Sequence, residues 1–406
     1  MTLDVRPFTG DPADFRRTVA SAFGWPARHE DQELWERTFE ADRAFGAYDG
    51  DALVGTAGTF SLSLTVPGGE LSMCGVTMVG VLPTHRRRGA LRRMMRLQLD
   101  QAHERGEPLA GLWASEGGIY GRFGFGVATF SASFQIERRR ALFHEPPPRE
   151  GRFRLLDEDE ARRALPPIFE AVRLSRPGTF SRSEAWWAAE FFHDPPEHRD
   201  GGSPASYVLH ETDGRPTGYA RYRLYPGFDE GGPRTTLEVH EVMAVTPAAE
   251  RELWGYLLDV DLVSTVRGRR LPPDHPLLHA LADPRRLGWR LSDGLWLRVL
   301  DVPAALEGRG WAADGRLVLE VQDEFCAWNA GRWQLEVDGG RARVQRTRSA
   351  ADLELSASEL GSIYLGGVTV AALLRAGRVA EVGPGSASRA DAMLRVDPEP
   401  WCPMIF

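Results

Sequence analysis

The chain has 406 residues, a net charge of −8, and 42% hydrophobic and 26% charged residues. This composition is typical of globular domains with substantial apolar cores, and the length predicts about two to four domains. The acidic balance and the lack of long basic runs exclude a chain built mainly to bind nucleic acid. No stretch of about 18 consecutive apolar residues occurs, so we expect no membrane span.

The first part of the chain alternates strand-like and helix-like patterns. Both early helices follow an acidic residue that is suited to an N-terminal cap, and the turn Pro67-Gly68-Gly69 between two long strand patterns indicates a hairpin. The predicted elements are strands 2–6, 53–66, 71–81 and 109–114, with helices 11–23, 31–39 and one that begins at Leu91.

The second part of the chain repeats features of the first. Three consecutive prolines, Pro146 to Pro148, cannot lie inside a helix or a central strand, so they predict the first domain boundary. Beyond them, the stretch 243–247 corresponds to 79–83, and Leu287-Gly288-Trp289 corresponds to Phe123-Gly124-Phe125. We interpret this as a degenerate repeat of one fold. The second copy lacks the arginine–glycine loop of the first, so we expect it to be catalytically silent.

The pattern changes again from about Asp301. Short strand patterns separated by the turn Asp338-Gly339-Gly340 precede two helical patterns. The chain ends on the apolar run 401–406, which predicts that its last residues are buried. The expected elements are strands 317–321, 333–337, 342–345 and 353–355, and helices 356–365 and 368–376.

Cysteine and histidine usage excludes several kinds of site. Cys74, Cys326 and Cys402 lie far apart and form no CxxC pair, so they predict neither a disulfide framework nor a zinc knuckle. Together with an N-terminus that lacks a signal-peptide pattern, they favour a cytoplasmic setting. His275 and His279 have a spacing that could share a metal ion, but prolines surround them, so we expect no metal site.

The stretch 76–95 carries the clearest chemistry. It reads as a strand, a basic loop that ends at Gly89, and a helix whose apolar residues recur at helical spacing. Free N–H groups at a helix N-terminus, the helix dipole and nearby arginines form an anion site, and a pyrophosphate is the natural ligand. A second stretch, 114–126, is rich in both glycine and aromatic residues, which is typical of a packed functional loop.

The basic loop, Arg86-Arg87-Arg88-Gly89-Ala90-Leu91, resembles the Arg-x-x-Gly-x-Gly/Ala loop of the GNAT superfamily of N-acetyltransferases, although Leu91 replaces the small last residue. Taken with Ala-Ser-Glu-Gly-Gly-Ile-Tyr-Gly-Arg-Phe-Gly at 114–124, it resembles the enhanced intracellular survival (Eis) family. The resemblance implies an α+β chain with two tandem GNAT-type domains, 1–147 and 148–298, and a C-terminal sterol-carrier-like domain, 299–406, whose end reaches the active site.

The resemblance also implies the roles of individual residues. Tyr120 would be the general acid, and the terminal carboxylate of Phe406 would be the general base. A tyrosine hydroxyl, with an ordinary pKa of about 10, is an acid of suitable strength for a leaving thiolate. The residues implied to bind acetyl-CoA are Val79, Gly80, Val81, Arg86, Arg87, Arg88, Gly89, Ala90, Leu91, Arg92, Ser115 and Glu116.

These features favour an acetyl-CoA-dependent N-acetyltransferase that acts on the amines of cationic, aminoglycoside-like small molecules by direct attack on the thioester. The alternatives are a protein lysine acetyltransferase, which would share the machinery, and a non-catalytic protein that binds a lipid or an acyl-CoA. The family resemblance further implies a hexamer. We expect no nucleic-acid and no membrane partner.

Overall fold

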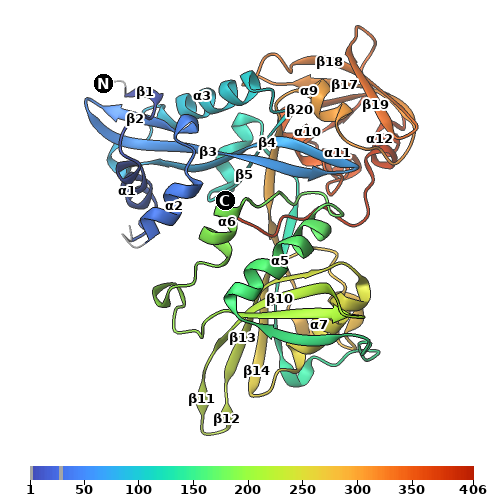
Figure 1. Cartoon of the computed structure of the whole chain (residues 1–406). Coiled ribbons are helices and arrows are strands. Elements are labelled where there is room, and N and C mark those ends of the chain that lie inside the picture. The colour runs from blue at the N-terminus through green and yellow to red at the C-terminus, as the bar shows by residue number, and fades with distance from the viewer. Residues whose placement is uncertain (1–2, 27–30) are drawn as a thin grey trace.

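The computed structural model describes residues 3–26 and 31–406 of the chain. These residues form two seven-stranded sheets, one five-stranded sheet and a two-stranded hairpin, with helices packed against them. Figure 1 shows three lobes, with the C-terminus in the middle of the molecule. The mixed α+β architecture predicted from the sequence is confirmed.

The first lobe is built on a sheet of order β1-β2-β3-β4-β5-β16-β6. The predicted hairpin between β3 and β4 is present, and its turn uses Gly68 at a φ of 76°. Helix α3 buries Met94, Met95 and Leu99 against the sheet. The elements of this lobe are β1 (Asp4–Pro7), α1 (Pro12–Phe23), α2 (Gln32–Thr38), β2 (Phe45–Asp49), β3 (Ala52–Val66), β4 (Gly69–Val81), α3 (Ala90–Glu104), β5 (Leu109–Trp113), α4 (Gly117–Tyr120) and β6 (Gly126–Val127).

The two early helices begin differently from one another. The Asp11 carboxylate accepts a hydrogen bond from the backbone N–H of Ala13 at 2.8 Å and so caps α1, as expected. Asp31 makes no such bond to α2, so the cap predicted there is wrong. Its carboxylate is instead held by the His193 ring at 2.7 Å, because the second lobe approaches α2 at this point.

The second lobe contains a sheet of order β15-β7-β14-β13-β10-β9-β8. Asp157 and Glu160 form a reciprocal capping box at the start of α5. The elements of this lobe are β7 (Phe130–Glu137), β8 (Arg152–Leu156), α5 (Glu158–Arg173), α6 (Glu184–Trp186), a π-helical turn (Trp187–Phe191), β9 (Ser206–Thr212), β10 (Arg215–Tyr225), β11 (Phe228–Asp229), β12 (Gly232–Pro233), β13 (Thr235–Ala244), α7 (Pro247–Asp259), β14 (Val263–Leu271), α8 (Leu277–Ala280) and β15 (Arg290–Asp293).

The first two sheets exchange strands across the expected domain limits. Strand β7 precedes residue 147 but lies in the second sheet, between β14 and β15. Strand β16 (Leu295–Val299) comes from the end of the second segment, yet it lies between β5 and β6 of the first sheet. Sheet membership therefore does not follow the chain limits drawn from the sequence. In these positions, the buried side chains of each strand pack into the hydrophobic core beside the sheet that the strand joins.

The third lobe contains a sheet of order β19-β18-β17-β20-β21, and the turn predicted between β18 and β19 has Gly339 and Gly340 at positive φ. Every strand and helix predicted for this segment is present within a few residues. The elements are α9 (Val302–Glu307), β17 (Gly315–Gln322), β18 (Gly331–Asp338), β19 (Arg341–Arg346), β20 (Leu353–Ser356), α10 (Ala357–Ile363), α11 (Val370–Arg375), β21 (Ala380–Glu381) and α12 (Ser386–Leu394).

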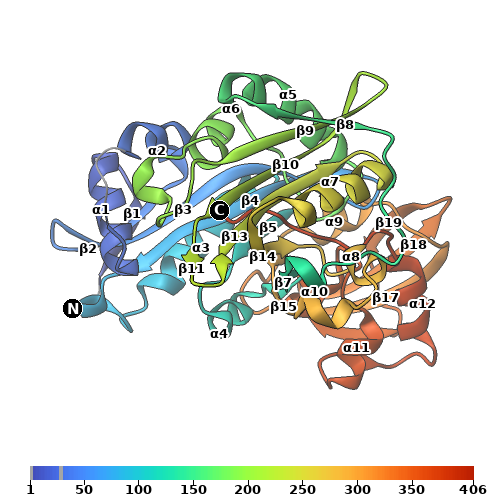
Figure 2. The same ribbon diagram turned by 90° about the horizontal axis from the view of Figure 1, so that it is seen from below.

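One hydrophobic core runs through all three lobes. It joins Met73 of β4, Phe169 of α5, Leu360 of α10 and Met404 of the C-terminal tail in a single cluster of buried side chains. Figure 2 shows the same convergence from below, with the C-terminus beside β4, β10 and β13. Among the described residues, no helix is both long and apolar enough to cross a bilayer.

Candidate active site

A cleft opens in the first sheet where β4 and β5 part. The two parallel strands pair only from Met73 to Gly75 on β4, opposite Leu109 to Gly111 on β5. Strand β4 continues to Val81 with β3 on one side and no described strand partner on the other. No described strand pairs with its backbone N–H and C=O groups on that side, which leaves an edge where an extended ligand can hydrogen-bond. A cavity of about 750 Å³ lies along this free edge.

A bulge in β4 lies next to the residues that line this cleft. Met78 has a φ of 52°, a left-handed value that non-glycine residues rarely adopt, and the β3–β4 register shifts beside it, between Thr56 and Gly58. The Thr56 hydroxyl donates a hydrogen bond to the Met78 carbonyl at 3.0 Å, and this bond stabilises the bulge. Such bulges re-aim backbone groups and are frequent beside active sites. The sequence gives no signal that marks Met78.

The opposite end of the cavity is formed by the N-terminus of α3. Gly89 begins α3 at a φ of 80° with no side-chain cap, and the first bond inside the helix runs from the Arg93 N–H to the Gly89 carbonyl. The N–H groups of Ala90, Leu91 and Arg92 therefore have no partner within the helix, and all three residues line the cavity. These free donors and the helix dipole favour a diphosphate there.

The arginines of the basic loop divide into two groups. Arg86 donates to the carbonyls of Val81 and Ala22, at 3.2 and 3.3 Å, so it holds the loop against β4 and α1. Arg88 is directed to Asp49 at 3.3 Å and does not line the cavity. Arg87 and Arg92 do line it.

Tyr120 forms the wall of the cavity at the end of α4. Its side chain is buried, and burial raises the pKa of its hydroxyl above the ordinary value of 10, an effect that a hydrogen bond with Ser115 opposes. The ring stands edge-on to Phe125, with 6.3 Å between centroids. Near neutral pH this hydroxyl is therefore a protonated donor facing the cavity.

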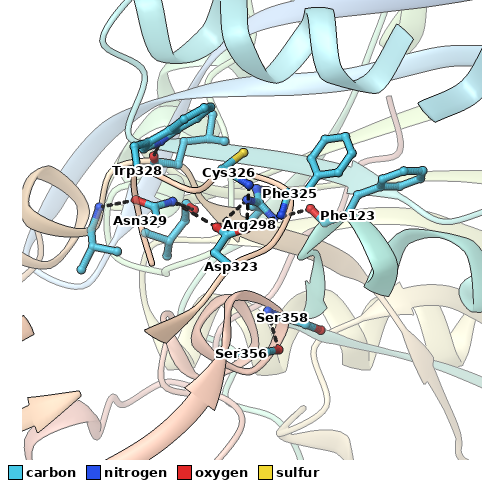
Figure 3. A network of polar contacts seen from close by, with 12 residues as sticks. Phe123, Arg298, Asp323, Phe325, Cys326, Trp328, Asn329, Ser356 and Ser358 are labelled. Carbon is cyan, nitrogen blue, oxygen red and sulfur yellow. Dashed lines mark hydrogen bonds and ion pairs between the residues drawn. The ribbon is translucent and has the colours of Figure 1, made fainter. Parts of the chain in front are cut away.

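A buried ion pair fixes the turn that carries Tyr120. Arg298 of β16 donates to the carbonyl of Phe123 and forms a 2.6 Å ion pair with Asp323 of the third lobe (Figure 3). The other Asp323 oxygen accepts from the backbone N–H groups of Phe325 and Cys326. Gly124 makes this possible, because a Cβ there would lie 1.6 Å from Nη1 of Arg298. The first and third lobes thus meet behind Tyr120.

The C-terminal residue lies on the face of β4 at the point where the cleft begins. The Phe406 ring is 5.2 Å from that of Phe180, at right angles to it, and a Cβ on Gly75 would come within 3.2 Å of the Phe406 ring. The tail is anchored by Trp401, whose N–H donates to the carbonyl of Pro177 at 2.8 Å. Of the end predicted to be buried, residues 401–404 are buried, whereas Ile405 is exposed and Phe406 is half-buried.

Most of the residues selected from the sequence surround one cavity. Arg88 and Phe406 are outside its lining. The selected residues that line it are Val79, Gly80, Val81, Arg86, Arg87, Gly89, Ala90, Leu91, Arg92, Ser115, Glu116 and Tyr120. Sequence reasoning missed the contribution of α1, whose Ala22 and Phe23 line the cavity, and of His85, Ile119, Arg122 and Phe123. The glycine at position 80 is the sequence feature that reflects this contact with α1, because a Cβ there would come within 2.8 Å of the Ala22 side chain.

Two groups of histidines bear on metal binding: the pair His275 and His279 noted in the sequence, and a second group that the sequence did not single out. His275 is buried and its Nδ1 accepts from the Leu277 N–H, while burial lowers its pKa to about 3. It therefore serves as a neutral helix cap. The structure does gather Asp31, His193 and His198, whose ligand atoms lie within 4.8 Å of one another. That carboxylate is already shared between the two imidazoles and the guanidinium of Arg16.

Comparison with known proteins identifies related acetyltransferases. Profiles of the acetyltransferase (GNAT) domain match residues 6–128 and 178–299, and a sterol carrier protein domain profile matches 302–403. An uncharacterized N-acetyltransferase from Streptomyces avermitilis is 43% identical over the whole of both chains. N-acetyltransferase Eis from Mycobacterium tuberculosis is 38% identical, over 91% of this chain and 90% of its own.

Solved structures give the same result. Eis1 from Mycobacterium abscessus is 35% identical, with a TM-score of 0.85 over 99% of this chain and 100% of its own. A GCN5-related N-acetyltransferase from Anabaena variabilis has the same TM-score at 18% identity, which shows the shared fold. The chain is an acetyl-transferring enzyme that belongs to the Eis family of GNAT-type N-acetyltransferases.

Proposed function

We propose that the first lobe binds acetyl-CoA in the cleft between β4 and β5. The pantetheine arm would pair with the free edge at Val79 to Val81, and the diphosphate would lie on the uncapped N-terminus of α3. One observation carries this proposal. A single cavity joins an unpaired strand edge, a helix N-terminus with free N–H groups and a buried tyrosine hydroxyl.

The acceptor amine would then attack the carbonyl carbon of the thioester directly. The new C–N bond forms as the C–S bond breaks, and backbone N–H groups of the free edge would stabilise the charge that develops on the carbonyl oxygen. The proton of the amine would pass to the carboxylate of Phe406. Tyr120 would protonate the departing thiolate and recover its proton from solvent.

The second lobe would take no part in this chemistry. Its equivalent helix, α7, is capped by the Thr246 side chain, which accepts from the Ala249 N–H at 3.2 Å. The backbone N–H of Ala249, which would otherwise be available to a phosphate, therefore already has a partner. The two lobes nevertheless share a structural feature at the repeated sequence: Gly124 and Gly288 each end a 3₁₀ turn in the left-handed conformation.

The role of the terminal carboxylate has a direct test. Deleting Phe406 removes the ring, whereas one glycine appended after Phe406 keeps the ring and displaces the carboxylate. Both variants should lose most of kcat for acetyl transfer, while Phe406→Leu, which keeps a carboxylate at the same position, should retain much of it. Full kcat in the glycine-extended variant would remove Phe406 as the base.

The acceptor class rests on the family resemblance, which favours cationic small molecules similar to aminoglycosides. A protein lysine is the alternative, because the same machinery would serve it. Release of free CoA thiol with aminoglycosides, polyamines and a lysine peptide separates the two. Extraction of the purified protein for bound lipid tests whether the sterol-carrier-like lobe holds an apolar ligand.

We also propose a cytoplasmic hexamer. All three cysteines are free and buried, which suits a reducing compartment. The hexamer rests on the resemblance, and light scattering of the purified protein tests it. A monomer at micromolar concentration would contradict it.

A further inference from the structure

A second cavity, of about 210 Å³, lies between the second sheet and the C-terminal tail. We call it the arginine cavity. Trp186, Phe191 and residues 403–405 of the tail form the rest of its wall. Its charged residues and histidine are Arg182, Glu190, Arg221, His240, Glu241 and Arg270. It has no assigned role in the acetyl-CoA site described above.

A bulge brings these groups together. Arg221 of β10 pairs with Glu241 of β13, but the next pair is Tyr222 with Val239, so His240 is an extra residue. The bulge lets both His240 and Glu241 contribute to the cavity wall, where strict alternation would turn one of them away.

The carboxylate of Glu241 is already occupied by Arg182 and Tyr219. Arg182 forms a two-point ion pair with both carboxylate oxygens of Glu241, and the Tyr219 hydroxyl donates to the same carboxylate at 2.6 Å. Glu241 therefore forms its ion pair with Arg182 and attracts Arg221 and Arg270 only through longer-range electrostatics. Glu190 forms no ion pair with either of them among the described residues.

Arg221 and Arg270 lack carboxylate partners in the described part of the chain. The guanidinium of Arg221 lies over the Phe191 ring at 4.8 Å, and its Nε is buried without a hydrogen bond. Arg270 makes one hydrogen bond, to the carbonyl of Pro403 at 3.2 Å. Nε2 of His240 is also buried without a partner.

These unpaired groups make the arginine cavity a site for an anion. Burying a guanidinium without a counter-charge is costly, and a bound carboxylate would offset that cost with charge-assisted hydrogen bonds. Burial and the nearby Arg221 lower the pKa of His240 to about 3, so this ring stays neutral at physiological pH and can donate or accept.

The cavity is also placed to hold part of an acceptor. Met404 and Ile405 line it, and the next residue, Phe406, packs on Gly75, where β4 and β5 begin to part. A small molecule anchored among the arginines would therefore lie along the tail that leads to the acetyl-CoA cleft.

We propose that the arginine cavity binds the carboxylate of the acceptor, so that the enzyme acetylates small amines that also carry a carboxylate, such as amino acids. This inference rests on the proposed acetyl transfer at the first-lobe cleft. It replaces the polycationic acceptor favoured by resemblance with a zwitterionic one, because a polycation would be repelled by Arg221 and Arg270.

Calorimetry with product-like probes tests the proposal without turnover. N-acetylglycine and N-acetylglycinamide differ only in the carboxylate, and each is titrated into the full chain with and without CoA. The carboxylate probe should bind at least about tenfold more tightly than the amide, and Arg221→Gln should abolish that preference. Arg316→Gln, which removes an exposed arginine of the third lobe, should leave it unchanged.

Several outcomes would overturn the proposal. These are equal binding of the two probes, no binding of either up to their solubility, or a preference that survives in Arg221→Gln. Unchanged acetyl-CoA affinity and circular dichroism in Arg221→Gln would show that the variant is folded. If acetyl-CoA itself fails to bind the wild type, the proposed function fails, while the probe comparison still decides the arginine cavity.

Discussion

Single residues behind the cavity fix the position of Tyr120. Gly124 has a φ of 81°, and any Cβ there would collide with Arg298. Gly124→Ala should therefore lower the free energy of unfolding by about 2–4 kcal/mol, through backbone strain and overpacking. Denaturant unfolding measures this. Gly121→Ala is the matched control, because Gly121 has a φ of −56° and open space around its Cα, so its stability should hardly change.

Tyr120 also predicts the pH dependence of the reaction. A general acid must be protonated, and burial raises the pKa of this hydroxyl above 10. The acid form therefore persists through neutral and mildly alkaline pH and is lost only as pH rises past that raised value. The pH profile of kcat should show no falling limb from Tyr120 below pH 10. A limb near pH 8 that disappears in Tyr120→Phe would contradict this assignment.

At the scale of elements, the proposed cofactor site predicts an effect of the start of α3 on acetyl-CoA binding. Gly89 has a left-handed φ but no close neighbours, so a substitution there acts through backbone conformation alone. Gly89→Ala should raise the KM for acetyl-CoA by about tenfold, because the turn that presents the free N–H groups becomes strained. Gly89→Asn should be milder, since asparagine tolerates this conformation. Equal effects of the two variants would contradict the mechanism.

Local patterns predicted the elements of this chain well. The hairpin at Gly68, the basic loop before α3 and the strands of the third lobe are set by turn residues and alternation close in sequence. The exchange of β7 and β16 could not be predicted, because it depends on pairing between strands distant in sequence. The same holds for Met78 and Arg221, whose roles arise from register shifts that leave no sequence signature.

For the whole molecule, the exchanged strands and the shared core predict strong coupling between the lobes. The core cluster joins β4, α5, α10 and the tail, and Arg298 links the first lobe to Asp323 of the third. Urea unfolding followed by tryptophan fluorescence and by circular dichroism should give coincident transitions. A separate early transition for the third lobe would contradict this coupling.

The whole-molecule arrangement also explains why the third lobe matters to an active site in the first. It supplies Asp323 behind Tyr120, and its last residues form a wall of the arginine cavity and bring Phe406 to β4. Most of the lining of the first-lobe cleft could be predicted from the sequence, because its basic loop is continuous in the chain. The proposed acceptor site could not, since it combines residues of the second lobe with the C-terminal tail, which are far apart in the chain.

The central claim is acetyl transfer at the first-lobe cleft with Tyr120 as the acid. The most direct measurement is release of free CoA thiol from acetyl-CoA by the wild type and by Tyr120→Phe, with a panel of amines that includes amino acids and aminoglycosides. The account predicts turnover by the wild type and a kcat lower by about 10²-fold or more in Tyr120→Phe, with unchanged acetyl-CoA affinity. An undiminished kcat in Tyr120→Phe would contradict it.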